Sequence, residues 1–353
     1  MIKLLHAADF HLDSAFSGLP PRLSAQRRRE QRLALTQLVE AARGCDAVLL
    51  AGDLFDSAGV YRDTLDALRE CFAAIDAPIL IAPGNHDFVA PGSPYLTEDF
   101  GKNVHIFRSA GFERITLDGF CVYGAAFTSP EAPALGAFCA EDPEACNILL
   151  LHGDTQPGSP YRFVDPKLLA GSGVSYLALG HVHRCHTDGN GPVPYGWPGC
   201  LSGRGFDECG QKGVLRVTLD EGRCSTEFVP ILTRRYEIVD ADVSEGAMAA
   251  IRAALPADTR NDCYRILLRG ESDGLSLEDL RAALEPEFFS LQLVDKTVPK
   301  NALWAHCGED TLRGSFLSRM KEEFDGADEV RKRVIVRAVR LTLALMDGRE
   351  VSE

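Results

Sequence analysis

Residues 177–186 read LALGHVHRCH, an apolar run with the character of a buried strand that ends at a glycine and is followed by His181 and His183. The chain holds 9 histidines among 353 residues, so two at positions i and i+2 directly after one strand are unusual. One histidine at a strand end is more often capped or solvated than bound to metal. The pair therefore predicts a ligand site only if other strands end in the same way.

Other predicted strands do end in side chains that can bind a metal ion. In chain order these side chains are Asp9 and His11, Asp53, the run Asn85, His86 and Asp87, then His152, and finally His181 and His183. Ligand sites in α/β sheets lie beyond the carboxyl ends of the strands, so these side chains are expected at one edge. Packing does not explain a repeated ending of this kind. The ordered set DxH, GDxxD, GNHD, H and GHxH therefore predicts a metal site.

Strands and helices alternate along the first part of the chain, which predicts an α/β fold. Strands are expected at 2–9, 46–53, 78–87, 104–107, 120–125, 147–154 and 175–183, and amphipathic helices at 24–43 and 61–74. Residues 190–230 are rich in glycine and proline and contain two β-like runs, 212–219 and 223–230. These runs suggest a second, more antiparallel sheet that closes the domain. The expected architecture is a two-sheet sandwich flanked by helices.

The character of the chain changes after about residue 240. Residues 245–299 alternate helix, strand, helix and strand, which is typical of a small α+β unit, and residues 309–347 are helical. No GxxxxGK[ST] motif occurs, so the chain has no P-loop of its own. The last helix has an apolar stripe made of Val330, Val334, Ala338, Leu341 and Leu345. This stripe is predicted either to pack on its own domain or to dock a partner.

The composition restricts the environment and the partners. The net charge is −14 at pH 7, so DNA binding would need a local basic surface or metal ions. The 11 cysteines are dispersed without CxxC pairs, which is typical of reduced thiols in the cytoplasm. No apolar run approaches the roughly 20 residues of a membrane span, and the start MIKLLHAADF lacks the pattern of a signal peptide. A cytoplasmic protein is expected.

The types of ligand select the chemistry. Carboxylate, imidazole and amide oxygen suit hard or borderline divalent ions such as Mn²⁺, and no cysteine lies among them. Seven ligands, taken from the nine side chains named above, are too many for one ion, but they divide well between two ions that share a carboxylate. Two ions about 3.5–4 Å apart can hold phosphoryl oxygens and lower the pKa of a bridging water. The neutral Asn85 would leave the site positive toward an anionic phosphate.

These motifs resemble those of the calcineurin-like metallophosphoesterases over roughly residues 1–230. The resemblance implies that Asp9, His11, Asp53 and His183 bind one ion. It implies that Asp53, Asn85, His152 and His181 bind the other, with Asp53 bridging the two. His86 matches the family's catalytic histidine, which binds no metal and assists the leaving group or the transition state. Asp56 in GDLFD matches the carboxylate that commonly orients this histidine.

Three stretches narrow the resemblance to the YhaO-type and SbcD-type DNA repair exonucleases. They are LLHAADFHLDSAFSGL near the start, GDLFD, and WPGCLSGRGFDECGQKG. The resemblance implies a phosphoesterase domain at 1–235, a DNA-contacting capping domain of α+β type at 236–300, and a helical segment at 301–353. That segment would dock on a coiled-coil ATPase of the SMC or Rad type, a separate chain in keeping with the missing P-loop. A homodimer is a further expectation.

Several assignments stay open at this stage. Arg204, in the glycine-rich loop from Gly199 to Gly205, is expected either to contact a phosphate or to pair with Asp207 or Glu208. His6 is expected in the core or behind the ligands, and His186 either at the substrate or on an exposed loop.

The function also has alternatives. The favoured hypothesis is a Mn²⁺-dependent DNA nuclease in which a metal-bound hydroxide attacks the phosphodiester. The alternatives are a small-substrate phosphodiesterase or phosphatase on the same dimetal core, and a scaffold subunit with a silent site. The roughly 120 residues after position 230 favour the nuclease, because a minimal phosphodiesterase does not need them. The intact ligand set and His86 disfavour the scaffold.

Overall fold

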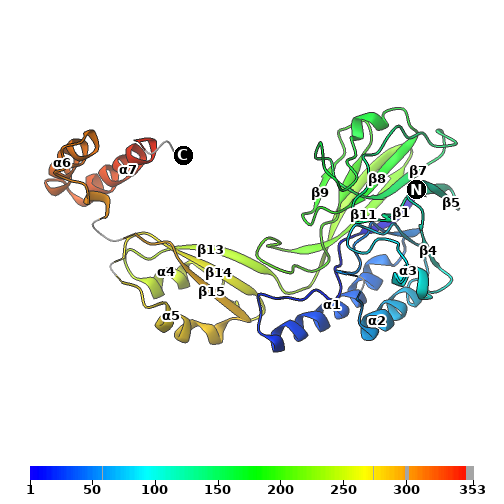
Figure 1. The fold of residues 1–353 in the computed structure, drawn as a ribbon, viewed down its shortest axis with the longest axis horizontal. Coiled ribbons are helices and arrows are strands. Elements are labelled where there is room, and N and C mark those ends of the chain that lie inside the picture. Colours follow the sequence, from blue (N-terminus) through cyan, green and yellow to red (C-terminus); the bar gives the residue numbers. More distant parts are fainter. Residues whose placement is uncertain (58, 273, 299–301, 347–353) are drawn as a thin grey trace. The chain divides into compact units, whose positions relative to one another are not determined.

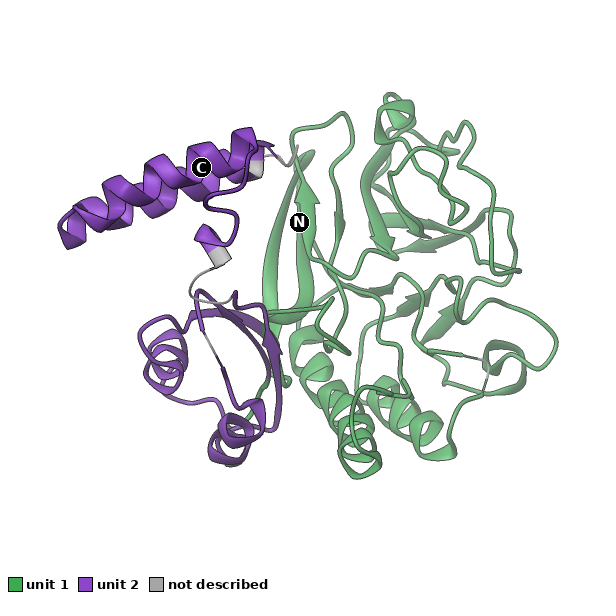
Figure 2. Cartoon of the chain, turned by 60° about the vertical axis from the view of Figure 1, so that its left-hand side comes forward, with its two compact units in different colours: residues 1–237, 261–263 green, residues 238–260, 264–353 purple. Residues whose placement is uncertain are grey.

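The structure is a computed structural model that describes residues 1–57, 59–272, 274–298 and 302–346. The chain divides into two compact units (Figure 2). Unit 1 comprises residues 1–237 and 261–263, and unit 2 comprises residues 238–260 and 264–353. Among the described residues, no helix is long and apolar enough to cross a membrane. The expected division into domains at 235 and 300 stays a prediction.

Unit 1 contains two six-stranded sheets (Figure 1). The first sheet has the order β12-β11-β1-β2-β3-β4, and its strands are Arg223–Ile231, Lys212–Asp220, Ile2–Ala7, Ala47–Leu50, Ile79–Ile81 and Val104–Ile106. The second has the order β5-β6-β7-β8-β10-β9, with strands Glu113–Leu117, Phe120–Gly124, Asn147–His152, Val174–Gly180, Tyr195–Trp197 and His186–Asp188. Strands β1 to β4 are parallel to one another, as are β6, β7, β8 and β10. The expected two-sheet α/β sandwich flanked by helices is confirmed.

One detail of the expected topology is wrong. The runs at 212–219 and 223–230 do form an antiparallel pair, but they do not start a second sheet. β11 pairs with β1 in antiparallel register from Ile2 opposite Leu219 to His6 opposite Leu215, so both strands extend the first sheet. The second sheet is built mainly from strands that precede residue 183. Which strands pair depends on contacts between residues far apart in the chain. The periodicity of one segment gives no information about such contacts.

The two faces of the first sheet are both buried, which explains its uninterrupted apolar strands. Leu5 and Val48 face helices α1 (Pro21–Ala42) and α2 (Arg62–Ala73), whose Leu35, Leu38, Leu68 and Phe72 complete that core layer. The alternate residues Leu4, Leu49 and Leu80 face the second sheet and pack on Val122, Leu150 and Tyr176. The strand ends are therefore fixed in position by packing on both sides.

Unit 2 contains a three-stranded sheet of order β13-β14-β15, with strands Tyr236–Asp242, Cys263–Arg269 and Ser290–Asp295. Helices α4 (Ala247–Ala254) and α5 (Leu277–Leu284) bury Ile251 and Leu284 against Ile266 and Leu268 of this sheet. Two further helices, α6 (Leu312–Asp325) and α7 (Glu329–Met346), share a small core of Leu317, Ile335 and Val339.

The apolar stripe predicted on the last helix does not form the contact between α6 and α7. Val330, Val334 and Leu345 are 73%, 58% and 65% exposed, whereas Ile335 and Val339 of the same helix are buried. Helix α7 therefore has two apolar faces, of which α6 covers one. Because the sequence pattern fits either face, only the packing identifies the one that stays open.

Candidate metal centre

The predicted ligands lie at the carboxyl ends of β1, β2, β3, β7 and β8, where the two sheets face each other. The chain leaves these strands with unusual backbone angles. Asp9, His11, Asp53 and His181 all have positive φ values, of 53°, 42°, 52° and 95°. Non-glycine residues with positive φ cost free energy and persist where surrounding structure enforces them, which is common at functional sites. Tight turns of this kind direct each side chain inward immediately after its strand.

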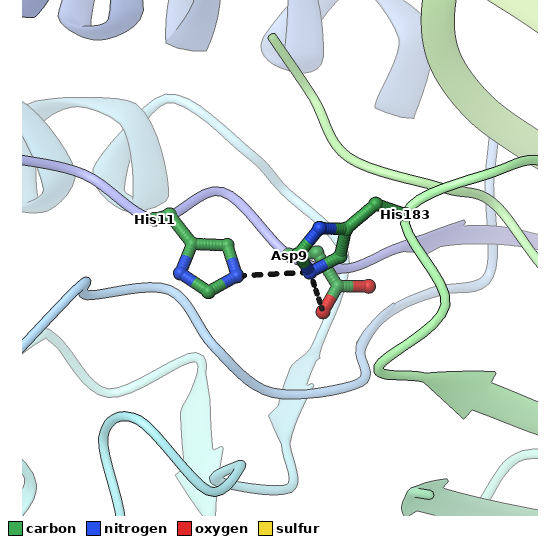
Figure 3. A group of neighbouring side chains, drawn as sticks. All are labelled: Asp9, His11 and His183. Atoms are coloured by element: carbon green, nitrogen blue, oxygen red, sulfur yellow. Dashed lines mark hydrogen bonds and ion pairs between the residues drawn. The ribbon is translucent and has the colours of Figure 1, made fainter. Parts of the chain in front are cut away.

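Asp9, His11 and His183 form the first cluster (Figure 3). The Nε2 atoms of His11 and His183 are 3.2 Å apart, and Nε2 of His183 is 3.8 Å from Oδ1 of Asp9. The opposite ring nitrogens are occupied: Nδ1 of His11 lies 3.1 Å from an Asp56 carboxylate oxygen, and Nδ1 of His183 lies 2.7 Å from one of Glu208. A carboxylate only accepts hydrogen bonds, so both Nδ1 atoms carry a proton, and in the neutral rings both Nε2 atoms carry a lone pair. Two facing lone pairs repel unless a cation joins them.

Asp53, Asn85, His152 and His181 form the second cluster. Nδ1 of His152 donates to the Ala51 carbonyl at 2.8 Å, so Nε2 is the nitrogen that faces the site, 2.9 Å from Oδ1 of Asn85. Nδ1 of His181 lies 3.2 Å from the same amide oxygen. When the two rings carry no proton on these nitrogens, all the atoms that converge here are acceptors. This convergence fits a second cation.

One carboxylate oxygen faces both clusters. Oδ2 of Asp53 lies 3.6 Å from Nε2 of His11 and 3.4 Å from Nε2 of His152. Asp9 and Asp53 also lie with His152 as a group whose ligand atoms are all within 4.8 Å of one another. The geometry therefore fits two ions that share Asp53, as the family resemblance implied. The ligand assignment itself stays a prediction.

The protonation properties of the site fit a cation as well. Burial raises the pKa of Asp9 to about 7, and burial lowers the pKa of His11 to about 4. For His152, burial acts against the charged form, but the charge of Asp53 and the contact with it outweigh burial and raise the pKa to about 9. In the absence of metal, a proton on His152 thus neutralises Asp53. A divalent ion would replace that proton, because metal ligands must be deprotonated.

His86 lies at the open side of the site. Its side chain is exposed, its ring centroid is 4.8 Å from that of His11, and its backbone N–H donates to Oδ1 of Asp53 at 2.9 Å. His86 also forms a candidate ligand group with His11 and Asp53, so its expected role as a histidine that binds no metal stays a prediction.

The expected contact between the Asp56 carboxylate and His86 is not what the structure has. Nδ1 of His86 lies 3.2 Å from the backbone carbonyl oxygen of Asp56, while the Asp56 carboxylate contacts His11 and Arg204. Asp56 lies in a bend directly after the Leu12–Phe55 bridge, and its carbonyl and its side chain contact different partners. Arg204 pairs with Glu208, at 2.6 Å, and with Asp56, so Glu208 is the partner found among the two carboxylates expected, while a phosphate contact of Arg204 stays a prediction.

A model of the family described as Calcineurin-like phosphoesterase matches residues 2–185, just over half of the chain. The chain belongs to this family. The family uses a dimetal centre, and the two clusters supply candidate ligands for it. The resemblance seen in the sequence motifs is thereby confirmed.

Two relatives add detail. An uncharacterized metallophosphoesterase of Bacillus subtilis, YhaO, is 28% identical over 325 residues, which are 82% of this chain and 77% of the relative. The DNA double-strand break repair protein Mre11 of Aeropyrum pernix is 27% identical over 268 residues, 70% of this chain and 65% of the relative. The solved structure of Vacuolar Protein Sorting 29 from Cryptosporidium parvum matches 65% of this chain and 97% of its own at 12% identity, with a TM-score of 0.31.

Asp87 is the main residue of this phosphoesterase site whose role the motifs did not predict. Its buried carboxylate accepts hydrogen bonds from the backbone N–H groups of Asp53, Leu54 and Gly84 and from the Tyr95 hydroxyl, at 3.2, 2.6, 2.7 and 2.6 Å. It thus joins the loop after β2 to the loop after β3. The GNHD motif contained Asp87, but nothing in the sequence indicated that it faces the backbone.

Two histidines outside the clusters, His6 and His186, had open assignments, and the structure places His6 in the core, while a substrate contact of His186 stays a prediction. His6 is fully buried, and its ring nitrogens contact the Tyr176 hydroxyl at 3.0 Å and the Leu179 carbonyl at 3.1 Å. Burial lowers its pKa to about 3, so it is a neutral core residue, as expected. His186 is exposed on β9, close to the rings of Trp197 and Tyr195.

Proposed function

We propose that this phosphoesterase hydrolyses phosphodiester bonds in DNA, with Mn²⁺ as its metal. The observation that carries the proposal is the pair of carboxylate, imidazole and amide clusters that face the same Asp53 carboxylate oxygen. Oxygen and imidazole donors without a thiolate suit Mn²⁺. Two such ions would supply positive charge for the phosphate oxygens and lower the pKa of water. The ligands would be Asp9, His11, Asp53 and His183 for one ion, and Asp53, Asn85, His152 and His181 for the other.

His86 would serve as the proton donor. Its Nδ1 lies 3.2 Å from the Asp56 carbonyl oxygen, so Nδ1 donates to the chain and Nε2 is left to exchange a proton with the leaving oxygen. General acid catalysis of this kind contributes about 10²–10⁴-fold to the rate. The Asp56 backbone, rather than its carboxylate, would orient the ring.

The relatives support DNA over a small substrate. The match to YhaO covers 82% of the chain and must extend into unit 2, because unit 1 comprises only residues 1–237 and 261–263. The name of the Aeropyrum pernix relative describes a DNA double-strand break repair protein. The similarity of this chain to that relative is the basis for proposing a repair exonuclease in the cytoplasm. The region 236–300 would be the DNA-contacting cap. The net charge of −14 implies that metal ions and partners must offset repulsion from DNA.

Helices α6 and α7 would dock a separate coiled-coil ATPase. The uncovered face of α7 contributes Val330, Val334 and Leu345, which α6 leaves exposed. Truncation after about residue 305 should leave unit 1 folded and able to hydrolyse a small diester, but should abolish co-purification with the ATPase. Equal recovery of the full-length and truncated chains with that subunit would reject the docking role.

Two substrates test the proposed activity. The purified protein is incubated with Mn²⁺ and end-labelled linear duplex DNA, and separately with bis-p-nitrophenyl phosphate. His86→Ala is the control for contaminating nuclease. We expect wild type to degrade DNA and the variant to be inactive on both substrates. Hydrolysis of the small diester alone would instead support the small-substrate phosphodiesterase.

A further inference from the structure

Two carboxylates that are not predicted ligands contact the two histidines of the GHxH motif on their outward sides. Glu208 lies 2.7 Å from Nδ1 of His183, and Asp154 lies 3.5 Å from Nε2 of His181. The inward nitrogens of these rings are therefore different atoms: Nε2 of His183 faces Asp9 and His11, whereas Nδ1 of His181 faces Asn85. Each carboxylate thus lies behind a different cluster.

Glu208 is held rigidly in position. Its side chain is 2% exposed, and it accepts hydrogen bonds from the backbone N–H of Arg204 at 2.8 Å and from the Arg204 guanidinium at 2.6 Å. The guanidinium also lies 3.1 Å from Nδ1 of His183, but it has no lone pair and cannot accept a proton. The proton on Nδ1 must therefore point to Glu208, which leaves the Nε2 lone pair for the first cluster.

Asp154 is held in a similar way at the second cluster. Its side chain is 14% exposed, and it accepts hydrogen bonds from the Ser159 hydroxyl and from the backbone N–H of Gln156, both at 2.8 Å. The Tyr161 ring lies against His181, with centroids 4.8 Å apart. The tyrosine ring confines the imidazole, and the carboxylate favours the proton on Nε2, which leaves Nδ1 to face Asn85 as a potential metal ligand.

We propose that Glu208 and Asp154 are positioning residues, each for one ion of the dimetal centre: Glu208 through His183 for the first cluster, and Asp154 through His181 for the second. The inference rests on the proposed metal centre. An outer carboxylate fixes the tautomer of a ligating histidine and raises its basicity, and its loss typically costs about 10–100-fold in metal affinity. Because the two carboxylates act on different rings, each loss should weaken one ion and spare the other.

The test measures Mn²⁺ binding by the full-length chain. Glu208→Gln and Asp154→Asn are compared with wild type and with Asp207→Asn, which changes an exposed carboxylate next to Glu208. Calorimetry and elemental analysis give affinity and stoichiometry, and electron paramagnetic resonance distinguishes a coupled Mn²⁺ pair from single ions. We expect each site variant to bind one ion normally and the other about 10–100-fold more weakly. Asp207→Asn should match wild type.

Double variants identify which ion is affected. Glu208→Gln should add no loss to His183→Ala, because its effect passes through that ring, but should add its full loss to His181→Ala. Asp154→Asn should show the reverse pattern. Thermal unfolding in chelator checks that each variant is folded. If Glu208→Gln does not fold, Arg204→Gln/Glu208→Gln removes both charges of the pair and takes its place.

The outcomes separate this inference from the proposed function. Equal weakening of both ions by either variant, or unchanged affinity in both, would overturn the positioning roles. Two Mn²⁺ ions in wild type without hydrolysis of either substrate would refute the nuclease proposal while leaving the positioning result valid. A wild type that binds no Mn²⁺ would refute the dimetal centre and the positioning roles together.

Discussion

Replacing Asp53 with asparagine should disrupt both candidate metal sites at once. In wild type, Oδ1 of Asp53 accepts the His86 backbone N–H at 2.9 Å, and Oδ2 faces Nε2 of His152 at 3.4 Å and Nε2 of His11 at 3.6 Å. Asparagine has the same shape but only one acceptor oxygen. If that oxygen stays with His86, the amide NH₂ group points at the two imidazole lone pairs and donates to them. The variant thus loses a charge and also fills the ligand positions with hydrogens.

The pKa of His152 indicates the size of the effect. Burial lowers this pKa, yet the charge of Asp53 and the contact with it raise it from 6.5 to about 9. At roughly 1.36 kcal/mol per pKa unit, this rise corresponds to about 3 kcal/mol of stabilisation of a positive charge on the His152 ring. A divalent ion interacts more strongly than a proton-bearing ring, so we expect at least about a 100-fold loss of affinity for each ion.

Mn²⁺ titration calorimetry and elemental analysis after anaerobic loading measure this loss. Asp118→Asn, in the exposed turn between β5 and β6, is the matched control and should bind two ions like wild type. Melting in the presence of chelator verifies that Asp53→Asn is folded. A folded variant that retains two tightly bound ions would refute the bridging assignment and the reasoning from His152.

Three further outcomes are expected. His86→Ala should lower hydrolysis by about 10²–10⁴-fold with normal metal content; metal loss on elemental analysis would make it a ligand instead. Gly180→Ala should lower the free energy of unfolding by about 1–3 kcal/mol and weaken Mn²⁺ binding, because a Cβ there would overlap the Ala51 carbonyl that orients His152. Gly189→Ala, which meets nothing within 4 Å, is its control, and equal melting temperatures would contradict the account. Mn²⁺ affinity should rise from pH 6 to 9, by up to about tenfold per pH unit for each proton that the metal displaces. The reason is that Asp9 loses its proton with a pKa of about 7 and His152 with a pKa of about 9. Calorimetry that finds no pH dependence of the affinity would exclude both groups as ligands.

The sequence alone determined the α/β class, the approximate strands and the residues at their ends. These features are local: a buried strand is an apolar run, and a metal site in this fold needs polar residues directly after such runs. The order of the motifs from Asp9 to His183 was therefore enough to predict a metal site, and the family resemblance of these motifs implied that Asp53 is shared by two ions. The separation between the core and the residues beyond 240 was visible for the same reason, as a change in periodicity.

Only the tertiary structure decided which atoms meet. The pairing of β11 with β1, the exposed stripe on α7, and the contact of the Asp56 carboxylate with His11 instead of His86 all depend on residues far apart in the chain. The sequence assigned neither Glu208 nor Asp154 to a metal site, because their roles come from the ring nitrogens that they contact. A hydrogen bond requires a specific distance and a specific direction of the lone pair. In this protein the packing of the two sheets sets both, and a local pattern of residues does not specify that packing.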